Sequence, residues 1–389
     1  MYYQAYDITN YNAILHPSYL KSPNLGAVLV YDSRVDDLAI YDAVVTEEMD
    51  ASGSFRFTMP TNHPYINQFD AVNKNAIVVV EYNDDNSFKT MIFGGILGEK
   101  DTDFLGNKVL TFYGLSIMLH NTPMNYKDYD GLRLMNVSND IWNKMISIYG
   151  QRVAYQYLFT FGSYEQWLVP PEIYSAQEMA TDFLKRLGEA INAATLSGNP
   201  FDIHYYTRFS STNSAFESVF VIGDYGSGTV SDQIVECGKN LLDYKETILD
   251  GDFFTGVIGY GAETDVEHYG RKERMYVPDD NYSYIDKVFY NSTLVATYGQ
   301  KVGFKTWDDV TLSSTLASRC QSFISQMKLK RKLDCRVFDL SKITNVDRFD
   351  LGEIVIVKPP KGSAEAFLIT KIERDLNDAS QDNITLQNW

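Results

Sequence analysis

Few residues of this chain have the types and spacing that catalysis requires. Its five histidines (His16, His63, His120, His204 and His268) are scattered along the sequence, whereas a general base or a nucleophile needs a positioned partner. The chain contains no HExxH, HxH or GxSxG motif, so zinc hydrolysis and serine-hydrolase chemistry have no local support. We therefore expect no catalytic, cofactor-binding or metal-binding residues and no cofactor, and we predict that the chain is not an enzyme.

The three cysteines could in principle serve a Cys–His protease or form a disulfide. Cys237, Cys320 and Cys335 are widely spaced and odd in number, and Cys320 lies on the apolar stripe of a predicted helix. We expect reduced thiols in a protein that is made in the cytoplasm, and not a disulfide framework.

Three short segments resemble ligand-binding motifs, but each has a simpler structural interpretation. Residues Asp101–Gly106 resemble the start of an EF-hand loop, yet the glutamate at the twelfth position and the flanking helices are missing, so a hairpin turn is expected. Gly223–Gly228 is glycine-rich like a phosphate loop, but no Lys-Ser/Thr pair follows it. The basic run Lys328–Lys332 follows a predicted helix, whose dipole it would complement, and nucleic-acid binding is the alternative.

The net charge argues against several classes of partner. The chain has 389 residues, 34 of them Lys or Arg and 51 Asp or Glu, which gives a charge of −17. Such a protein is a poor candidate for clamping DNA or an anionic membrane, because phosphate groups bind clustered cations. No apolar run reaches the roughly 18 residues of a membrane span, and the N-terminus lacks the regions of a signal peptide, so we predict no stable membrane insertion.

Aromatic residues make up 14% of the chain, including 28 Tyr and 22 Phe. Aromatic side chains favour strands and are enriched at protein–protein interfaces. Two interpretations stay open from composition alone: a β-rich protein, and a β-rich protein with large permanent interfaces.

The elements that would carry these side chains are mainly strands. Six short β-rich segments follow residue 26, and 54–60 alternates cleanly between apolar and polar residues. Helical spacing occurs at 137–150, at 175–194 after a Ser175/Glu178 capping box, and at 313–330. The stretch 245–263 is predicted to form a strand, a turn and a second strand, and more strands end the chain.

The order of strands near the start repeats near the end. Three strand segments at 76–82, 88–100 and 107–115 match three others at 353–359, 365–374 and 383–387. The aligned residues are Ile77 with Ile354, Phe93 with Phe367, and Val109 with Ile384. The spacing predicts two copies of one structural unit.

These patterns predict an α+β, mainly β fold in which two similar small β-barrels flank a mixed α/β middle domain. We expect an N-terminal segment at 1–22, a first barrel at 23–118 and a mixed domain at 119–237 that includes the helix 313–330. The second barrel is expected at 238–389, interrupted around 305–332.

Several motifs occur in the order found in siphophage tail-associated lysin (Tal) and baseplate-hub proteins. Residues 53–69 (GSFRFTMPTNHPYINQF) resemble that family's first-barrel stretch, and Phe93–Ile96 its Phe-x-Gly-x-Ile strand. Gly238–Leu242 resembles its Gly-Lys-Asn-Leu segment, and Val257–Ala262 and Leu351–Glu353 follow in order. Over roughly residues 25–389 the chain is similar to a short form of this family that lacks the C-terminal catalytic domain.

The resemblance implies a structural hub at the tip of a phage tail, in the virion, made in the cytoplasm of a bacterial host. It implies a homotrimer with a central channel or plug that joins the distal tail protein and the tape-measure protein, with receptor-binding proteins as further candidate partners. DNA would pass through during ejection and host entry without specific binding. Because longer relatives carry their catalytic domain beyond the last barrel, the resemblance assigns no catalytic residue here.

Two other functions stay open at this point. A receptor- or saccharide-binding tail module would use exposed tyrosines, and a cell-wall hydrolase would need a constellation that the sequence does not offer. The acidic composition also predicts a channel wall that is acidic or neutral, with Lys328–Lys332 on the outer face or in a subunit contact, beside carboxylates.

Overall fold

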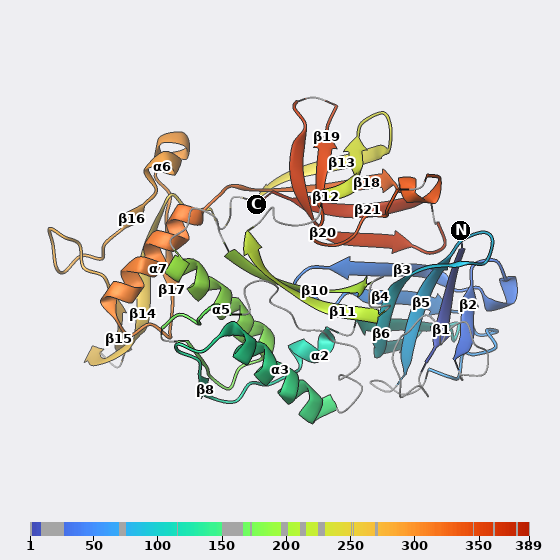
Figure 1. The fold of residues 1–389 in the computed structure, drawn as a ribbon, viewed down its shortest axis with the longest axis horizontal. Coiled ribbons are helices and arrows are strands. Elements are labelled where there is room, and N and C mark those ends of the chain that lie inside the picture. Colours follow the sequence, from blue (N-terminus) through green and yellow to red (C-terminus); the bar gives the residue numbers. More distant parts are fainter. Residues whose placement is uncertain are drawn as a thin grey trace.

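The computed structural model describes residues 2–8, 27–69, 75–114, 116–149, 166–171, 173–195, 201–210, 215–224, 230–249, 251, 253–268, 271–344, 346–360, 362–378 and 380–388. Within them the fold is α+β and mainly β, as predicted, with two similar curled sheets and a mixed region of helices and strands (Figure 1). No helix in this described part is long and apolar enough to span a bilayer.

The first barrel is an antiparallel curled sheet with the strand order β3-β4-β7-β6-β5-β1-β2. Its strands are β1 (Tyr2–Asp7), β2 (Val28–Asp32), β3 (Tyr41–Glu48), β4 (Ser54–Met59), β5 (Ala76–Tyr82), β6 (Phe88–Thr102) and β7 (Lys108–Gly114), with the 3-10 helix η2 (Asp36–Leu38) after β2. Alternate side chains of a strand point to one face, so Phe55, Phe57 and Met59 of β4 enter the core with Leu110 and Phe112 of β7.

The position of β1 corrects the domain boundary that we expected near the N-terminus. β1 pairs with both β2 and β5, so residues 2–7 belong to the first sheet and not to a separate segment at 1–22. The sequence of β1 has no clear alternation because both of its faces are buried: Tyr3 and Ala5 lie in the barrel core, and Tyr2 lies in a second apolar cluster. Residues 9–26 lie outside the described residues.

The second barrel has the strand order β13-β18-β21-β20, with β19 beside β20 and β12 parallel to β19. Its elements are β12 (Val230–Glu236), β13 (Leu241–Leu249), β18 (Lys330–Phe338), β19 (Ile354–Lys358), β20 (Glu365–Asp375), β21 (Gln381–Gln387) and the 3-10 helix η4 (Leu340–Lys342). β12 therefore lies in this barrel, whereas we expected residues 119–237 in the middle domain.

The strands β5, β6 and β7 and the strands β19, β20 and β21 have the same order and the same irregularity. β6 has a bulge between Leu97 and Glu99, and β20 has one between Ile369 and Lys371. Aligning the bulges moves the repeat by one or two residues from the sequence alignment. The aligned pairs become Ile77 with Val355, Leu97 with Ile369, and Leu110 with Ile384.

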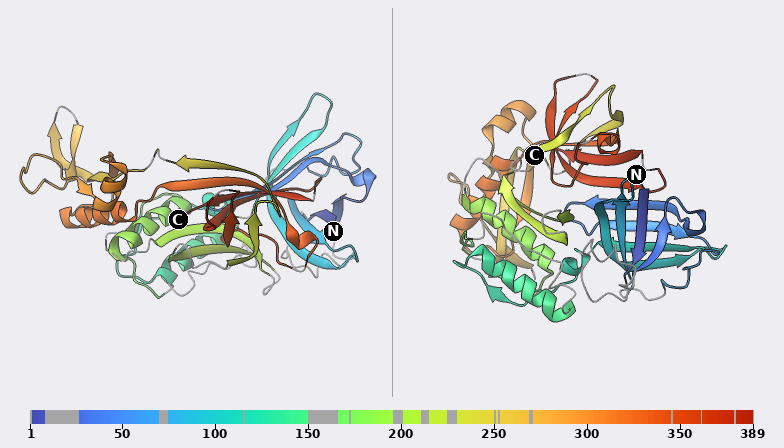
Figure 2. Two further views of the ribbon diagram at one scale, coloured as in Figure 1. Left: turned by 90° about the horizontal axis from the view of Figure 1, so that it is seen from above. Right: turned by 45° about the vertical axis from the view of Figure 1, so that its right-hand side comes forward.

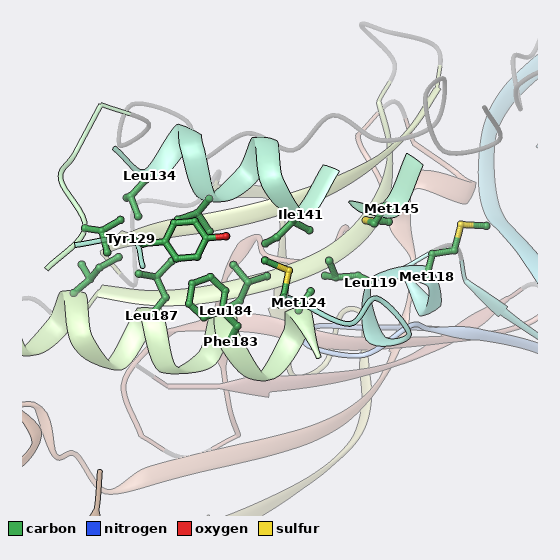
Figure 3. Close-up of a cluster of buried hydrophobic side chains, with 14 of the residues drawn as sticks. Met118, Leu119, Met124, Tyr129, Leu134, Ile141, Met145, Phe183, Leu184 and Leu187 are labelled. Carbon is green, nitrogen blue, oxygen red and sulfur yellow. The ribbon is translucent and has the colours of Figure 1, made fainter. Parts of the chain in front are cut away.

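The middle region packs helices against the back of the first barrel. Its elements are α2 (Ile117–His120), β8 (Lys127–Asp128), α3 (Leu134–Tyr149), β9 (Tyr174–Ser175), α5 (Ala180–Thr195), β10 (Phe201–Ser210) and β11 (Ala215–Asp224). Figure 3 shows Tyr129 between α3 and α5, where its ring stacks on Phe183 at 5.2 Å. Val78 and Val80 of β5 join this cluster, so β5 is buried on both faces.

A further unit is inserted between β13 and β18, and we call residues 251–327 the insertion. It contains β14 (Gly256–His268), β15 (Arg271–Tyr276), β16 (Phe289–Tyr290), α6 (Ser292–Tyr298), β17 (Val302–Thr306) and α7 (Ser313–Gln326). It extends to one side of the barrels (Figure 2, left view). The interruption of the second barrel is thus longer than the one expected around 305–332.

The insertion has its own core, in which α7 covers β14. Leu316, Cys320 and Ile324 of α7 pack with Val257 and Trp307. Gly259 of β14 permits this close packing, since a Cβ there would lie 2.2 Å from the Cys320 sulfur.

Candidate assembly surfaces

The histidines that could serve catalysis occupy unrelated positions. His63 is buried in the turn after β4, where its Nδ1 accepts a hydrogen bond from the Tyr65 backbone at 3.2 Å and burial lowers the pKa of its ring. His120 ends α2, and burial lowers its pKa as well. His16 and the side chains of His204 and His268 lie outside the described residues.

Two of the three cysteines are core residues. Cys320 and Cys335 are buried as free thiols, and burial raises the pKa of each to about 12. Such thiols are poor nucleophiles. Cys237 is exposed. In the described part of the chain, no group of three or more His, Cys, Asp or Glu side chains is arranged to hold a metal ion.

The segment that resembles an EF-hand loop is a hairpin turn between β6 and β7, as expected. The Asp103 carboxylate accepts backbone hydrogen bonds from Leu105 at 2.8 Å and Asn107 at 2.9 Å, and a third bond from the Asn107 side chain at 2.9 Å. These bonds lower the pKa of Asp103. They also fix the conformation of the turn. Phe104, the residue after Asp103, is 95% exposed.

The glycine-rich segment Gly223–Gly228 is only partly described by the structure, and the basic run Lys328–Lys332 has a structural role. Gly223 is in β11, whereas residues 225–229 lie outside the described residues. α7 ends at Gln326, so the basic run does not complement its dipole as we expected. Arg331 and Lys332 instead lie in the first residues of β18, which starts at Lys330. Arg331 contacts Glu246 at 2.7 Å and Glu365 at 2.5 Å, and Lys332 contacts Asp334 at 3.1 Å.

One continuous sheet runs through both barrels because β20 pairs with β3. The pairing extends from Lys371 opposite Glu48 to Asp375 opposite Val44. Residues that pair across neighbouring strands share a face of the sheet. One such row crosses from one barrel to the other: Lys245, Asp334, Thr385, Lys371 and Glu48. From β13 to β3, the sheet therefore has an apolar face toward the two cores and a polar face on the opposite side.

The polar face is hollowed in the second barrel. A groove of about 730 Å³ lies over β18, β20 and β21 and extends to the ends of β3 and β13. Its lining includes five carboxylates and four cationic side chains, and several of these form pairs, such as Lys371 with Glu373 at 2.7 Å. The groove therefore has mixed charge and no cationic cluster.

A buried arginine holds the junction of the barrels on the apolar side. Arg374 of β20 is 3% exposed, contacts the Glu47 carboxylate of β3, and donates to the Phe349 carbonyl oxygen at 2.7 Å. Its Nε lies 3.6 Å from Asp382. Beyond it, Leu376 of the β20–β21 hairpin is 2% exposed and lies in the core of the first barrel.

Comparisons with known proteins find this fold in phage tails. No family model and no curated protein matches the chain. Solved structures of phage tail proteins share its fold. The 43 kDa tail protein of prophage MuSo2 from Shewanella oneidensis matches 99% of this chain and 98% of its own, with a TM-score of 0.56 and 10% identity.

Two further structures match over a similar length. A tail protein from Neisseria meningitidis covers 99% of this chain and 96% of its own at a TM-score of 0.58, and the prophage tail protein gp18 from Listeria monocytogenes covers 99% and 94% at 0.53. Both are 10% identical to this chain. At this low sequence identity, the similarity shows a shared fold and nothing more.

The surfaces with unusual exposure were not identified from the sequence. They are the tip of the β6–β7 hairpin, with Phe104 at 95% and Leu105 at 63% exposure, and the edge strand β13. The exposure of the hairpin tip could have been predicted from the sequence. Two large apolar residues lie inside a polar Asp-x-x-Gly turn, from which their side chains cannot easily reach the core of their own barrel.

A partly buried carboxyl in the second barrel gives a pH-dependent prediction. Burial raises the pKa of Glu353 to about 7, with nearby Asp350 and Asp347 acting in the same direction. Because the folded-state pKa exceeds the unfolded one, the protonated carboxyl stabilises the fold at low pH, and this contribution is lost as pH rises from about 4.5 to 7. Glu353→Gln should therefore raise the free energy of unfolding at pH 8 by about 1–2 kcal/mol, after allowance for solvent screening.

The measurement is urea denaturation of both proteins at pH 5 and pH 8. The increase in the free energy of unfolding caused by Glu353→Gln should be smaller at pH 5, because the carboxyl of the parent protein is already largely protonated there. Glu263→Gln, at an exposed carboxylate in the insertion, is the matched control and should change little at either pH. An equal increase in stability at both pH values would contradict the raised pKa of Glu353.

Proposed function

We propose that this chain is a structural subunit of a phage tail, or of a related tail-like particle, and that it forms a hub at the tail tip. The observation that carries the proposal is the fold match with prophage tail proteins over nearly the whole of this chain and nearly the whole of theirs. The sequence motifs that resemble the Tal and baseplate-hub family support the tip position. We assign the chain no enzymatic activity.

The hub in this proposal is a homotrimer around a threefold axis. Each chain contributes two similar barrels that already share one sheet. Three chains then present six quasi-equivalent barrels, a number that suits attachment to a sixfold tail ring without a new type of interface. The distal tail protein and the tape-measure protein are the partners that the family resemblance implies.

The polar face of the joint sheet forms the wall of the channel in this proposal. Its charges are of both signs and several of them are paired, so the wall lacks the clustered cations that hold DNA by counterion release. Duplex DNA could then pass during ejection without being retained. Lys332 belongs to this wall in the proposal, whereas we expected the basic run on the outer face or in a subunit contact, beside carboxylates; Asp334 lies 3.1 Å from it.

One observation favours a second candidate function, the binding of a receptor or saccharide. Tyr282 and Tyr284 in the insertion are 53% and 78% exposed, with ring centroids 6.0 Å apart. Exposed aromatic rings provide apolar platforms with a polar edge. Binding of a host saccharide that is lost in Tyr284→Ser would support this function, which is compatible with a hub.

Light scattering on the purified chain tests the main proposal. We expect a particle of about three times the 44.3 kDa of one chain, and no retardation of duplex DNA at physiological salt. A monomer or dimer at micromolar concentration, with no trimer in assembled tails, would contradict the hub. Tight DNA binding by a trimer would contradict the proposed channel wall.

A further inference from the structure

The sheet of the insertion is apolar on both faces, but α7 covers only one of them. Val257 of β14 points toward α7 and lies in the core of the insertion. Successive residues of a strand point to opposite faces, and residues that pair across strands share a face. Ile258 of β14 therefore shares the other face with Phe304 of β17, which lies opposite it and is 74% exposed.

Two more residues extend this other face over three neighbouring strands. Gly256 of β14 lies opposite both Tyr290 of β16 and Val302 of β17, which are 46% and 42% exposed. We call this set of side chains the aromatic face; it consists of Ile258, Tyr290, Val302 and Phe304. Single exposed apolar residues are common, whereas a contiguous exposed apolar patch is typical of a binding site.

Gly256 fixes the position of the Tyr290 ring. A Cβ atom at residue 256 would lie 2.6 Å from Cδ1 and 2.7 Å from Cε1 of Tyr290, so the ring extends across the backbone of the glycine. A side chain at residue 256 would prevent this contact, and a glycine in a strand often marks such a close approach. The sheet thus supports the ring from one side and leaves its other side toward solvent.

The loop between β15 and β16 carries two more exposed tyrosines and is fixed beside the aromatic face. Tyr260 and Tyr276 lie opposite each other in β14 and β15, on the same side of the sheet as Ile258. The Tyr260 hydroxyl donates to the Asp286 carboxylate at 2.7 Å, and the Tyr276 hydroxyl donates to the Ser283 carbonyl oxygen at 3.2 Å. These bonds hold the loop in place before any ligand binds.

The aromatic face points away from the middle region. On the opposite side of the sheet, Lys305 of β17 contacts Glu189 of α5 at 3.2 Å, and Asp309 lies 3.6 Å from Arg186 of the same helix. The insertion itself extends to one side of the barrels (Figure 2, left view). The aromatic face is therefore open to a large ligand.

The charged groups beside the aromatic face favour an uncharged ligand. The loop holds three carboxylates, which belong to Asp279, Asp280 and Asp286. Its cation, Lys287, contacts Asp280 at 2.7 Å. Arg274 of β15, on the same side of the sheet as Tyr276, is paired with Asp308. A polyanion such as a poly(glycerol phosphate) binds clustered cations, and this surface does not present them.

We propose that the aromatic face and the adjoining loop bind an uncharged polysaccharide of the bacterial surface. This inference rests on the second candidate function above and names the class of its ligand and the residues of its site. Each pyranose ring has a side of C–H groups that packs on an aromatic ring, because the face of that ring carries partial negative charge. Tyr282 and Tyr284 extend the row of rings beyond the sheet.

The carboxylates at the rim supply the polar contacts. The Asp280 side chain is 76% exposed and accepts hydrogen bonds from sugar hydroxyls in this proposal, and hydrogen bonds to an ionised acceptor are stronger than neutral ones. Each single site binds weakly because it is a surface and not an enclosed pocket. Three copies in the proposed homotrimer would together hold a long chain more tightly than one copy does.

Saturation-transfer NMR titrations of the full chain with chitohexaose and with maltohexaose test the proposal. Both probes are uncharged chains of pyranose rings, and stacking depends little on the type of sugar. Phe304→Ser and Tyr284→Ser should each raise the dissociation constant about three- to tenfold, as expected for the loss of one stacked ring. Phe304→Trp, which enlarges the ring, should bind at least as tightly as the parent chain.

Phe104→Ser is the matched control. Phe104 is 95% exposed in the first barrel, outside the insertion, so this change should leave the dissociation constant unchanged. If neither probe binds to the folded parent chain, or if Phe304→Ser and Phe104→Ser have equal effects, the proposed site is wrong. A Phe304→Ser chain that binds sugar normally but no longer enters tails would show a protein interface instead, and would also overturn the proposal.

A charged probe tests the class of ligand. A hyaluronan hexasaccharide also contains N-acetylglucosamine but has a carboxylate on every second sugar. It should bind at least tenfold more weakly than chitohexaose at low salt, and equal or tighter binding would overturn the assignment to an uncharged chain.

The outcomes separate this inference from the proposed functions. A trimer by light scattering that binds neither neutral probe would overturn the sugar site and leave the hub intact. A monomer that binds chitohexaose, with weaker binding in Tyr284→Ser, would support the site and contradict the hub. Binding of a host protein that is lost in Tyr284→Ser, without any binding of sugar, would keep the second candidate function and overturn the class of ligand.

Discussion

Replacing Arg374 with alanine should lower the free energy of unfolding by about 3–5 kcal/mol. The guanidinium is 3% exposed and contacts Glu47 of the other barrel, with Asp382 at 3.6 Å. Its removal leaves two carboxylates near the junction without their cation, and a buried unpaired charge costs several kcal/mol. Chemical denaturation monitored by circular dichroism measures the change.

Arg336→Ala is the matched control, since Arg336 lies on the same sheet but is exposed, and it should cost less than about 1 kcal/mol. In a double variant, Glu47→Gln should recover part of the loss caused by Arg374→Ala, because one of the stranded charges is then absent. Strictly additive effects of the two changes would contradict the role assigned to this pair.

Asp309→Ala should also lower the free energy of unfolding by about 3–5 kcal/mol. The Asp309 carboxylate accepts hydrogen bonds from both terminal nitrogens of Arg319 on α7, at 3.1 and 3.0 Å, and lies 3.6 Å from Arg186 on α5. Arg319 is 4% exposed, so it would remain as a buried charge without this partner. Hydrogen exchange along α7 should accelerate in parallel with the loss of stability.

The neighbouring residue gives the control for this change. Asp308 is also paired with an arginine, Arg274, but its side chain is 78% exposed, so Asp308→Ala should cost less than about 1 kcal/mol. Equal losses at Asp308 and Asp309 would mean that the contact between α5 and α7 does not depend on the buried ion pair.

Elements with a strong local pattern were predictable from the sequence. β4 alternates apolar and polar residues because one face meets the barrel core. The helix predicted at 313–330 is present as α7, and its apolar stripe through Leu316, Cys320 and Ile324 is buried as expected. The order of the repeated strands was also visible, since it depends only on where the strands and turns fall.

Local pattern was misleading where tertiary partners decide the structure. Ser175 and Glu178 read as a capping box, but α5 begins at Ala180. Ser175 instead donates to the Asn125 carbonyl oxygen, and Glu178 pairs with Arg186. The stretch 245–263 does form two strands, but β13 and β14 belong to different sheets, which a short loop in the sequence cannot reveal.

The assembly surfaces were hidden for a related reason. A sequence shows which segments form strands, but whether β13 has a second neighbour depends on the order of strands in the finished sheet. Phe104 after β6 is exposed, whereas Leu376 at the aligned position after β20 is buried in the other barrel, and the sequence alone does not show this difference.

The insertion starts and ends at neighbouring points of the same sheet. Leu249 of β13 pairs with Lys330 of β18, so the chain of 80 residues between them starts and ends a single interstrand spacing apart, about 5 Å. A segment whose ends meet in this way can be lengthened, shortened or exchanged with little effect on the sheet that carries it. Changes in the length of this segment are therefore compatible with an unchanged joint sheet.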